Sequence, residues 1–429
     1  MLTSYSRSGW LSRRALLFVS ASLAAFGASG TGRAVAAPNY LYQQTIQIPG
    51  TSAANKFIGY DLAAFDPSNQ LYYLTDRSNN GIDVFSAATN ASVGKIGAGL
   101  FAGATPSNDN AGPNGISLSS VGAGKLLVAG NGPSNLITFN LDNSGLGVVG
   151  APRTTSTAVA GTPVPPNRVD GVAYAPGPNT ILAANNASNP GFLTLIDNAT
   201  GTVKASILLN GTKGYPDVGN NGVEATIYNT TTKSYFVAVP ALNAAGTGAG
   251  GAIELDAATG ALLHTYDLNA LGFSGPCSPT GLVQGAGASM FIACSDATAG
   301  RSVVLDPTGT AKITIVAGIS GGDQTAYDPA RNVFFEAARF QVGGPVLGIV
   351  DAATNTLTQL VPIGANDHSV AVDPVSGEVF VATAATTAFA NCSNGCIGVF
   401  AVQVPEPATL PTMAVALMGF GLLALRRRA

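Results

Sequence analysis

Four similar segments decide the fold: Asp197-Asn-Ala-Thr-Gly201, Asp256-Ala-Ala-Thr-Gly260, Asp306-Pro-Thr-Gly309 and Asp351-Ala-Ala-Thr-Asn355. Each segment lies between two short apolar runs. An Asp side chain at the start of such a segment bonds the backbone just after it, and Gly or Asn at the end tolerates positive φ. The motif therefore predicts a tight turn between antiparallel strands, and its recurrence predicts a repeated unit.

The repeated unit contains four short strands, which in the first copy are Asp61–Asp66, Leu71–Thr75, Ile82–Phe85 and Ser92–Ile96. Successive copies begin 43 to 56 residues apart, at Asp61, Asn114, Asp170, Glu224, Thr280, Asp323 and His368. Four strands per copy at this period are typical of β-propeller blades. We therefore predict an all-β, seven-bladed β-propeller. A Greek-key β-sandwich is the alternative, but it does not explain seven like copies.

The last copy is incomplete. It contains His368–Asp373, Glu378–Thr383 and Ile397–Val402, and it has no fourth strand. An unassigned strand, Tyr42–Ile48, lies near the N-terminus. We predict that this N-terminal strand completes the last blade and closes the ring, which leaves only protected strand edges.

Composition excludes several classes of protein. Only 10% of the 429 residues are charged, against about 25% in ordinary soluble domains. A hydrophobic content of 46% argues against disorder. The net charge of −3 offers no basic face, so we expect no nucleic-acid partner. Four arginines lie before residue 38, and three arginines and Glu406 lie after residue 405. Residues 38–405 therefore contain 13 basic and 22 acidic residues, a net charge of −9.

The N-terminus has the features of a signal peptide. Arg13 and Arg14 precede an apolar run over residues 15–26, and Ala34 and Ala36 form a small-x-small cleavage site. A largely apolar run of twelve residues matches a signal-peptide core and is too short to span a bilayer. The twin arginines leave open whether export follows the general or the twin-arginine route.

The C-terminus carries a more specific pattern. Val404, Pro405, Glu406 and Pro407 precede an uncharged run over residues 408–425, and three arginines follow it. The run is just long enough for a short membrane helix, with the arginines on the cytoplasmic side. The pattern resembles the PEP-CTERM sorting signal of Gram-negative bacteria. That resemblance implies an exosortase and the export machinery as partners, transient membrane anchoring, and delivery to the cell surface or extracellular matrix.

Three segments are therefore expected: a signal peptide (1–36), the propeller (37–403) and the sorting signal with a short transmembrane helix (404–429). The body also resembles secreted YVTN-repeat and gluconolactonase-like propellers, through its Asp-Ala-Ala-Thr turns and Ser369-Val-Ala-Val-Asp-Pro374. The WD-repeat branch is excluded because the only Trp, Trp10, lies in the signal peptide. We expect a monomer.

The residues that open the first strands should meet at the mouth of the central channel. Carboxylate and amide oxygens with one imidazole suit a divalent cation such as Ca²⁺, Mg²⁺ or Mn²⁺. The candidate metal ligands are Asp61, Asn114, Asp170, Glu224, Asp323 and His368. The resemblance to gluconolactonase-like propellers implies a metal at this location, although His368 departs from their ligand pattern. In the alternative interpretation, these polar side chains lock neighbouring blades together.

The four cysteines permit two disulfides and three connectivities. We favour Cys277 with Cys294, across a hairpin that turns at 284–289, and Cys392 with Cys396, around a tight loop. His264 lies on a predicted outer strand and should be exposed.

Three functions remain open. The favoured one is a cell-surface or matrix binding module, whose partners include extracellular polysaccharide or surface proteins. The alternative is a divalent-metal-dependent lactonase or esterase with its site at the channel mouth. The third is a purely structural matrix protein. The sequence does not decide whether the protein is an enzyme.

Overall fold

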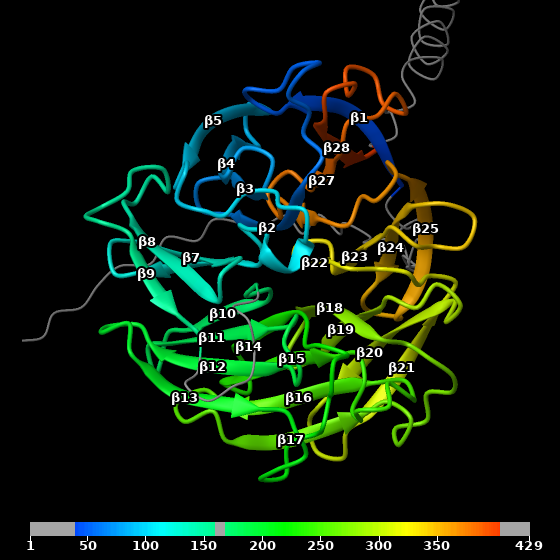
Figure 1. Cartoon of the computed structure of the whole chain (residues 1–429). Helices are drawn as coiled ribbons and strands as arrows, with labels where there is room; N and C mark the ends of the chain where they lie inside the picture. Colours follow the sequence, from blue (N-terminus) through cyan, green and yellow to red (C-terminus); the bar gives the residue numbers. More distant parts are fainter. Residues whose placement is uncertain (1–38, 159–167, 404–429) are drawn as a thin grey trace, which may run out of the picture. The chain divides into compact units, whose positions relative to one another are not determined.

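The computed structural model describes residues 39–158 and 168–403. These residues form seven four-stranded antiparallel sheets arranged as blades around a common centre (Figure 1). The all-β, seven-bladed propeller predicted from the repeats is confirmed. A short 3-10 helix, η1 (Asn108–Asn110), lies in the loop between blades 1 and 2.

The strands follow one another from the centre of the ring outward in each of the first six blades. Blades 1 to 3 comprise β2 (Tyr60–Asp66), β3 (Leu71–Asp76), β4 (Gly81–Ser86) and β5 (Ala91–Ile96); β6 (Ile116–Val121), β7 (Gly124–Asn131), β8 (Asn135–Leu141) and β9 (Arg153–Ser156); and β10 (Val172–Ala175), β11 (Thr180–Asn185), β12 (Phe192–Asp197) and β13 (Val203–Leu208).

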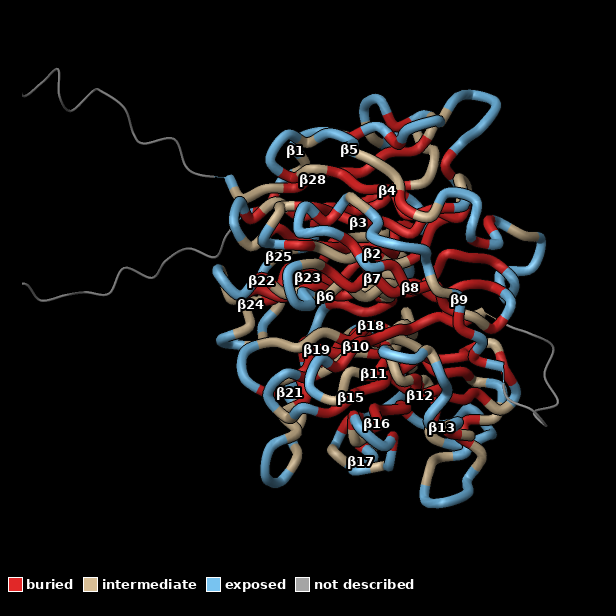
Figure 2. The backbone as a smooth tube through the Cα atoms, turned by 90° about the vertical axis from the view of Figure 1, so that its left-hand side faces the viewer, coloured by how far each residue is buried: buried red, intermediate tan, exposed pale blue. Residues whose placement is uncertain are grey.

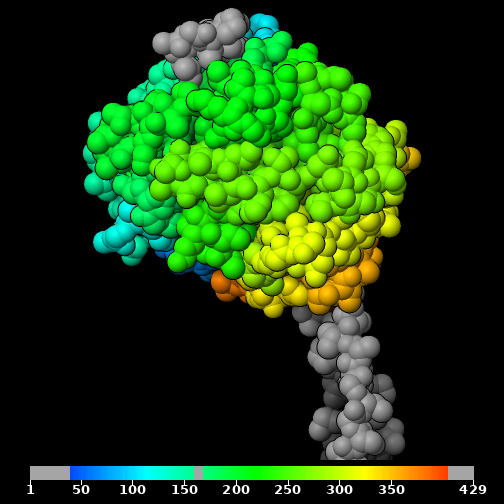
Figure 3. Space-filling model, turned by 90° about the horizontal axis from the view of Figure 1, so that it is seen from below, coloured from blue at the N-terminus to red at the C-terminus, as the bar shows by residue number. Residues whose placement is uncertain are grey.

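Blades 4 to 6 comprise β14 (Thr226–Asn229), β15 (Ser234–Val239), β16 (Gly251–Asp256) and β17 (Leu262–Asp267); β18 (Pro279–Gln284), β19 (Met290–Cys294), β20 (Arg301–Asp306) and β21 (Lys312–Ala317); and β22 (Thr325–Asp328), β23 (Val333–Ala338), β24 (Val346–Asp351) and β25 (Thr356–Pro362). Figure 3 shows blades from the middle of the chain (green) adjoining those from its last third (yellow to orange).

Blade 7 combines the two ends of the propeller. It contains β26 (Val370–Val372), β27 (Val379–Thr383), β28 (Cys396–Val402) and, as its outermost strand, β1 (Tyr40–Gln47). β1 pairs antiparallel with β28, so that Tyr40 faces Val402 and Gln47 faces Cys396. The predicted closure by an N-terminal strand is therefore confirmed.

The core lies between neighbouring blades. The middle strands β3, β11, β15 and β23 are buried along their whole length, whereas outer strands such as β5 are largely exposed. Figure 2 shows buried segments (red) through the blades and exposed segments (blue) at the turns. Between blades 7 and 1, the ring of Phe380 stacks on the ring of Tyr72, with the ring centroids 5.3 Å apart. Burial on both faces explains why these strands show no polar alternation.

The recurrent turns have the predicted geometry. Asp256 accepts bonds from the backbone and hydroxyl of Thr259 at 2.8 and 2.6 Å, and Gly260 has a φ of 74°. In the last of the four turns, in blade 6, Asn355 stands at the position of this glycine and has a φ of 55°. Because these turns connect the third and fourth strands, they all lie at one face of the ring. The innermost strands begin at the opposite face, where the candidate site lies.

Candidate functional site

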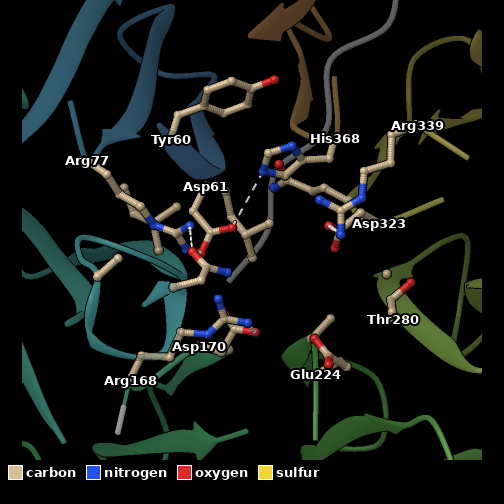
Figure 4. Close-up of a pocket in the computed structure, with 18 of the residues that line it drawn as sticks. Tyr60, Asp61, Arg77, Arg168, Asp170, Glu224, Thr280, Asp323, Arg339 and His368 are labelled. Carbon is tan, nitrogen blue, oxygen red and sulfur yellow. Dashed lines mark hydrogen bonds and ion pairs between the residues drawn. The ribbon is translucent and has the colours of Figure 1, made fainter. Parts of the chain in front are cut away.

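A cavity of about 730 Å³ opens where the innermost strands begin. Residues from several blades line it, and charged side chains surround its interior (Figure 4). Six of the seven predicted positions line the cavity: Asp61, Asp170, Glu224, Thr280, Asp323 and His368. The repeat alignment therefore predicted the location of this cavity and most of its acidic lining.

Asn114 does not line the cavity. Its amide group donates to the carbonyls of Ala111 and Val169, both at 2.9 Å, and its oxygen accepts from Arg77 at 3.0 Å. The bond to Val169 joins blade 2 to the segment that enters blade 3. Thr280 makes a similar link, because its hydroxyl donates to the carbonyl of Gly322 at 2.9 Å. These two hydrogen bonds link neighbouring blades.

Three arginines also reach the cavity, and the sequence prediction missed them. Arg77 follows β3, and its guanidinium contacts Asp61 at 2.5 Å and Asn108 at 2.7 Å. The side chains of Arg77 and Asp61 are about nine-tenths buried. Because Arg77 also bonds Asn114, one cation joins blade 1, the η1 loop and blade 2.

Arg168 and Arg339 repeat this pairing with other carboxylates. Arg168 contacts Asp170 at 3.4 Å, and Asn186 donates to the same carboxylate oxygen at 2.6 Å. Arg339 follows β23 and contacts Asp323 at 2.9 Å. Three of the four ring carboxylates therefore carry an arginine partner. Two of these arginines, Arg77 and Arg339, directly follow the second strand of their blade. A basic residue at that position is the sequence signal that could have identified them.

Glu224 has a different environment. Burial, together with the negative charge of nearby Asp170, raises the pKa of the Glu224 carboxyl well above its usual range, and Arg168 opposes this shift. A raised pKa favours the protonated form of the carboxyl. This form can donate as well as accept a hydrogen bond.

His368 belongs to an aromatic stack at the edge of the cavity. Its ring stacks on Tyr60 with centroids 4.6 Å apart, and Tyr60 stacks on Phe57 at 4.9 Å. Nδ1 lies 2.7 Å from the carbonyl of Asn366, which requires the proton on Nδ1. Nε2 therefore faces Asp61, 3.8 Å away.

The mouth of the cavity carries exposed apolar side chains. Phe340 is 51% exposed and Ile58 is 66% exposed, and both line the cavity. The Arg339 guanidinium lies 4.7 Å from the centre of the Phe340 ring. A polar interior is thus combined with an aromatic ring at the entrance.

No group of three or more His, Cys, Asp or Glu side chains within residues 39–158 and 168–403 is placed to hold a metal ion. Asp61, Asp170 and Asp323 each give a carboxylate oxygen to an arginine, an oxygen for which a bound cation would have to compete. The metal site at Asp61, Asn114, Asp170, Glu224, Asp323 and His368 stays a prediction.

The remaining predicted residues lie elsewhere. Cys277 is bonded to Cys294, and Cys392 to Cys396, which is the favoured connectivity. His264 lies on the outer strand β17 and is exposed. The cleavage residues Ala34 and Ala36 and the motif Val404, Pro405, Glu406 and Pro407 lie outside the described residues. So does the predicted membrane helix, and within the described residues no helix is long and apolar enough to cross a membrane.

Comparison with known proteins identifies the C-terminus. Residues 403–428 match the PEP-CTERM protein-sorting motif. No curated protein matches the chain. The motif indicates an exported, cell-surface protein of a Gram-negative bacterium that is processed by an exosortase. The resemblance of the body to YVTN-repeat and gluconolactonase-like propellers stays a prediction.

Solved structures similar to the chain share its fold at low identity. Hydrazine synthase of Kuenenia stuttgartiensis is 14% identical with a TM-score of 0.54, over 79% of this chain and 96% of that one. A chain of the mitotic checkpoint complex is 12% identical with a TM-score of 0.56, over 92% and 100%. The β-propeller domain of Cps50 (Swd1) from Myceliophteria thermophila is 11% identical with a TM-score of 0.56, over 85% and 100%. At these identities the likeness concerns the fold alone.

Proposed function

We propose that this exported propeller is a cell-surface binding module whose central cavity takes an uncharged, polyhydroxylated ligand, such as a segment of extracellular polysaccharide. The observation that carries the proposal is the pairing of Asp61, Asp170 and Asp323 with arginines inside one cavity. Within each pair the two charges cancel, and the raised pKa of Glu224 favours its neutral form. Hydrogen-bonding groups nevertheless remain on every side of it (Figure 4).

Such a lining suits hydroxyl groups. A hydroxyl donates to a carboxylate and accepts from a guanidinium, so neighbouring hydroxyls of one ligand can use both members of an ion pair. Hydrogen bonds to charged groups contribute about 1.5–3 kcal/mol each. A strongly charged ligand would meet a like charge beside every opposite one. The cavity volume of about 730 Å³ lies within the range of small-molecule sites, about 300–1,000 Å³.

Phe340 adds an apolar surface for the ligand. The faces of a sugar ring carry C–H groups, which pack on aromatic rings while the hydroxyls remain free to bond. Phe340 is half exposed at the cavity mouth, and Arg339 lies over its ring. This arrangement favours a ligand with both an apolar face and a hydroxylated edge.

Calorimetric titration of the processed protein with neutral oligosaccharides tests the proposal. Phe340→Ala should weaken binding about 2- to 12-fold, because an aromatic contact contributes about 0.5–1.5 kcal/mol. Val342→Ala is the matched control: Val342 is 72% exposed nearby and does not line the cavity. Equal losses in both variants, or no binding by the wild type, would refute the proposal.

The metal-dependent hydrolase is the competing function, and Glu224 separates the two. Gln at this position keeps a neutral group that donates and accepts, whereas it removes a carboxylate ligand. We expect Glu224→Gln to retain ligand binding, and Ca²⁺, Mg²⁺ or Mn²⁺ to leave the Tm of the wild type unchanged. A cation-dependent rise in Tm that Glu224→Gln abolishes would favour the hydrolase.

A further inference from the structure

We propose that the membrane-tethered form of the protein holds its cavity away from the bilayer. The sorting signal, residues 404–429, is called the tail here, and the body ends at Gln403 on the face of the propeller opposite the cavity mouth. The face that contains the cavity mouth is called the cavity face here. The face with the Asp-x-x-Thr turns is called the tail face. The inference concerns orientation and does not depend on which ligand the cavity takes.

The direction of the strands shows at which face of the propeller the body ends. The cavity residues Asp170, Glu224 and His368 come directly before the innermost strands of their blades. Because the sheets are antiparallel, the first and third strands of a blade begin at the cavity face and end at the tail face. β28 is the third strand of blade 7, so it ends at the tail face with Val402.

Local contacts agree with this assignment. Just before β28 begins, the carbonyl of Asn394 accepts a bond from the amide of Phe57 at 2.9 Å. Ile58, the next residue, lines the cavity. At the other end of β28, Val402 pairs with Tyr40, the first residue of β1.

The two ends of the propeller leave it side by side. The amide of Gln403 donates to the carbonyl of Asn39 at 2.8 Å. Asn39 lies three residues after the predicted signal cleavage site at Ala36, and Gln403 is the first residue of the sorting-motif match. Both ends of the mature body therefore emerge from blade 7 at the tail face.

The tail is too short to reach around the blade. Only residues 404–407 separate Gln403 from the uncharged run that begins at Ala408. Four extended residues span about 14 Å. β28 has seven residues, which span about 23 Å from the cavity face to the tail face. A bilayer that holds the uncharged run must therefore contact the tail face or the outer edge of blade 7.

The experiment compares two dye positions on blade 6, the neighbour of the tethered blade. Val342 lies in the β23–β24 loop on the cavity face, and Ala353 lies in the β24–β25 turn on the tail face. Both are exposed. The four native cysteines form the two disulfides, so Val342→Cys and Ala353→Cys each supply one free thiol. The labelled chains, all without the signal peptide (residues 1–36), are reconstituted in phosphatidylcholine vesicles that carry a headgroup-linked acceptor dye.

Energy transfer to the lipid acceptor should be roughly twofold higher from Ala353→Cys than from Val342→Cys, because the blade separates the two positions by about 20 Å. Chains that end at Gln403 should show no transfer from either position. Equal transfer, higher transfer from Val342→Cys, or transfer that persists without the tail would overturn the proposed orientation. Each variant is compared with the wild type by Tm, so that loss of folding is recognised separately.

Discussion

Gly115 illustrates how single residues control the packing around the cavity. It follows ring position 114, and a Cβ on it would lie 1.7 Å from the carbonyl oxygen of Asp170 in the next blade. Gly171 and Gly281 occupy the same place in their blades, and a Cβ there would lie 2.4 and 2.0 Å from the carbonyl oxygens of Glu224 and Asp323. Glycine is therefore needed here for close approach of the innermost strands.

Gly115→Ala should destabilise the propeller by about 1–3 kcal/mol, because the added methyl forces neighbouring backbones apart. Gly177→Ala is the matched control, since a Cβ at Gly177 would have no atom within 4 Å. Urea denaturation of both variants tests the difference. Equal stability of Gly115→Ala and the wild type would contradict the packing described here.

Buried carboxyls make stability depend on pH. Burial raises the pKa of Glu336 from 4.5 to about 8, an effect that the Ser302 hydroxyl partly opposes. Burial also raises the pKa of Asp83 to about 8 and that of Asp367 to about 7. These groups ionise at lower pH in the unfolded chain than in the folded one. Their contribution is therefore full below their unfolded pKa values and is lost as pH rises towards the folded values.

The Tm of the wild type should consequently fall between pH 5 and about pH 8. Glu336→Gln removes one of the titrating groups and should reduce this fall, although Asp83 and Asp367 maintain part of it. Thermal melts across this pH range measure the effect. An identical pH dependence in the variant and the wild type would mean that Glu336 does not contribute.

At the scale of strands, β1 joins the two ends of the ring. It covers β28, and Gln359 of blade 6 bonds both backbone groups of Tyr40 at 2.8 Å. Deleting residues 38–47 should expose the edge of β28 and lower the Tm of the whole propeller in one transition. A deletion variant with the wild-type Tm would show that ring closure does not depend on β1.

The two disulfides differ in the length of chain they close. Cys277 and Cys294 are 17 residues apart, and Cys392 and Cys396 are 4 apart. By restricting the unfolded chain, the disulfide that closes the longer loop should stabilise the fold by about 3 kcal/mol, and the one that closes the shorter loop by about 2 kcal/mol. Replacing the first pair by Ala should therefore lower the free energy of unfolding more than replacing the second pair.

Repeats made the fold predictable, whereas the cavity was predictable only in part. The phase of the repeats places Asp61, Asp170, Glu224 and Asp323 at equivalent positions, so their convergence follows from the fold. Arg77, Arg168 and Arg339 lie on loops and have long side chains. Their positions in the repeats therefore do not predict where their guanidinium groups lie. Asn114 was in phase, but its side chain bonds Ala111, Val169 and Arg77 and does not line the cavity.

At the scale of the whole molecule, the arginine pairs change what a ring of carboxylates can do. Unpaired, four carboxylates would attract a cation. Three of these carboxylates are paired with arginines, and the raised pKa of Glu224 favours its neutral form, so the same ring lines a hydrogen-bonding cavity of little net charge. The sorting motif brings this cavity to the cell surface, where the proposed ligand is a neutral polysaccharide segment.

The charge selectivity of the cavity tests this claim most directly. The processed protein is titrated with a neutral oligosaccharide and with an oligosaccharide of the same length that carries uronic acids. We predict that the neutral one binds and that its acidic counterpart binds more weakly. Tighter binding of the acidic oligosaccharide, or binding of neither, would contradict the proposed role of the arginine-paired carboxylates.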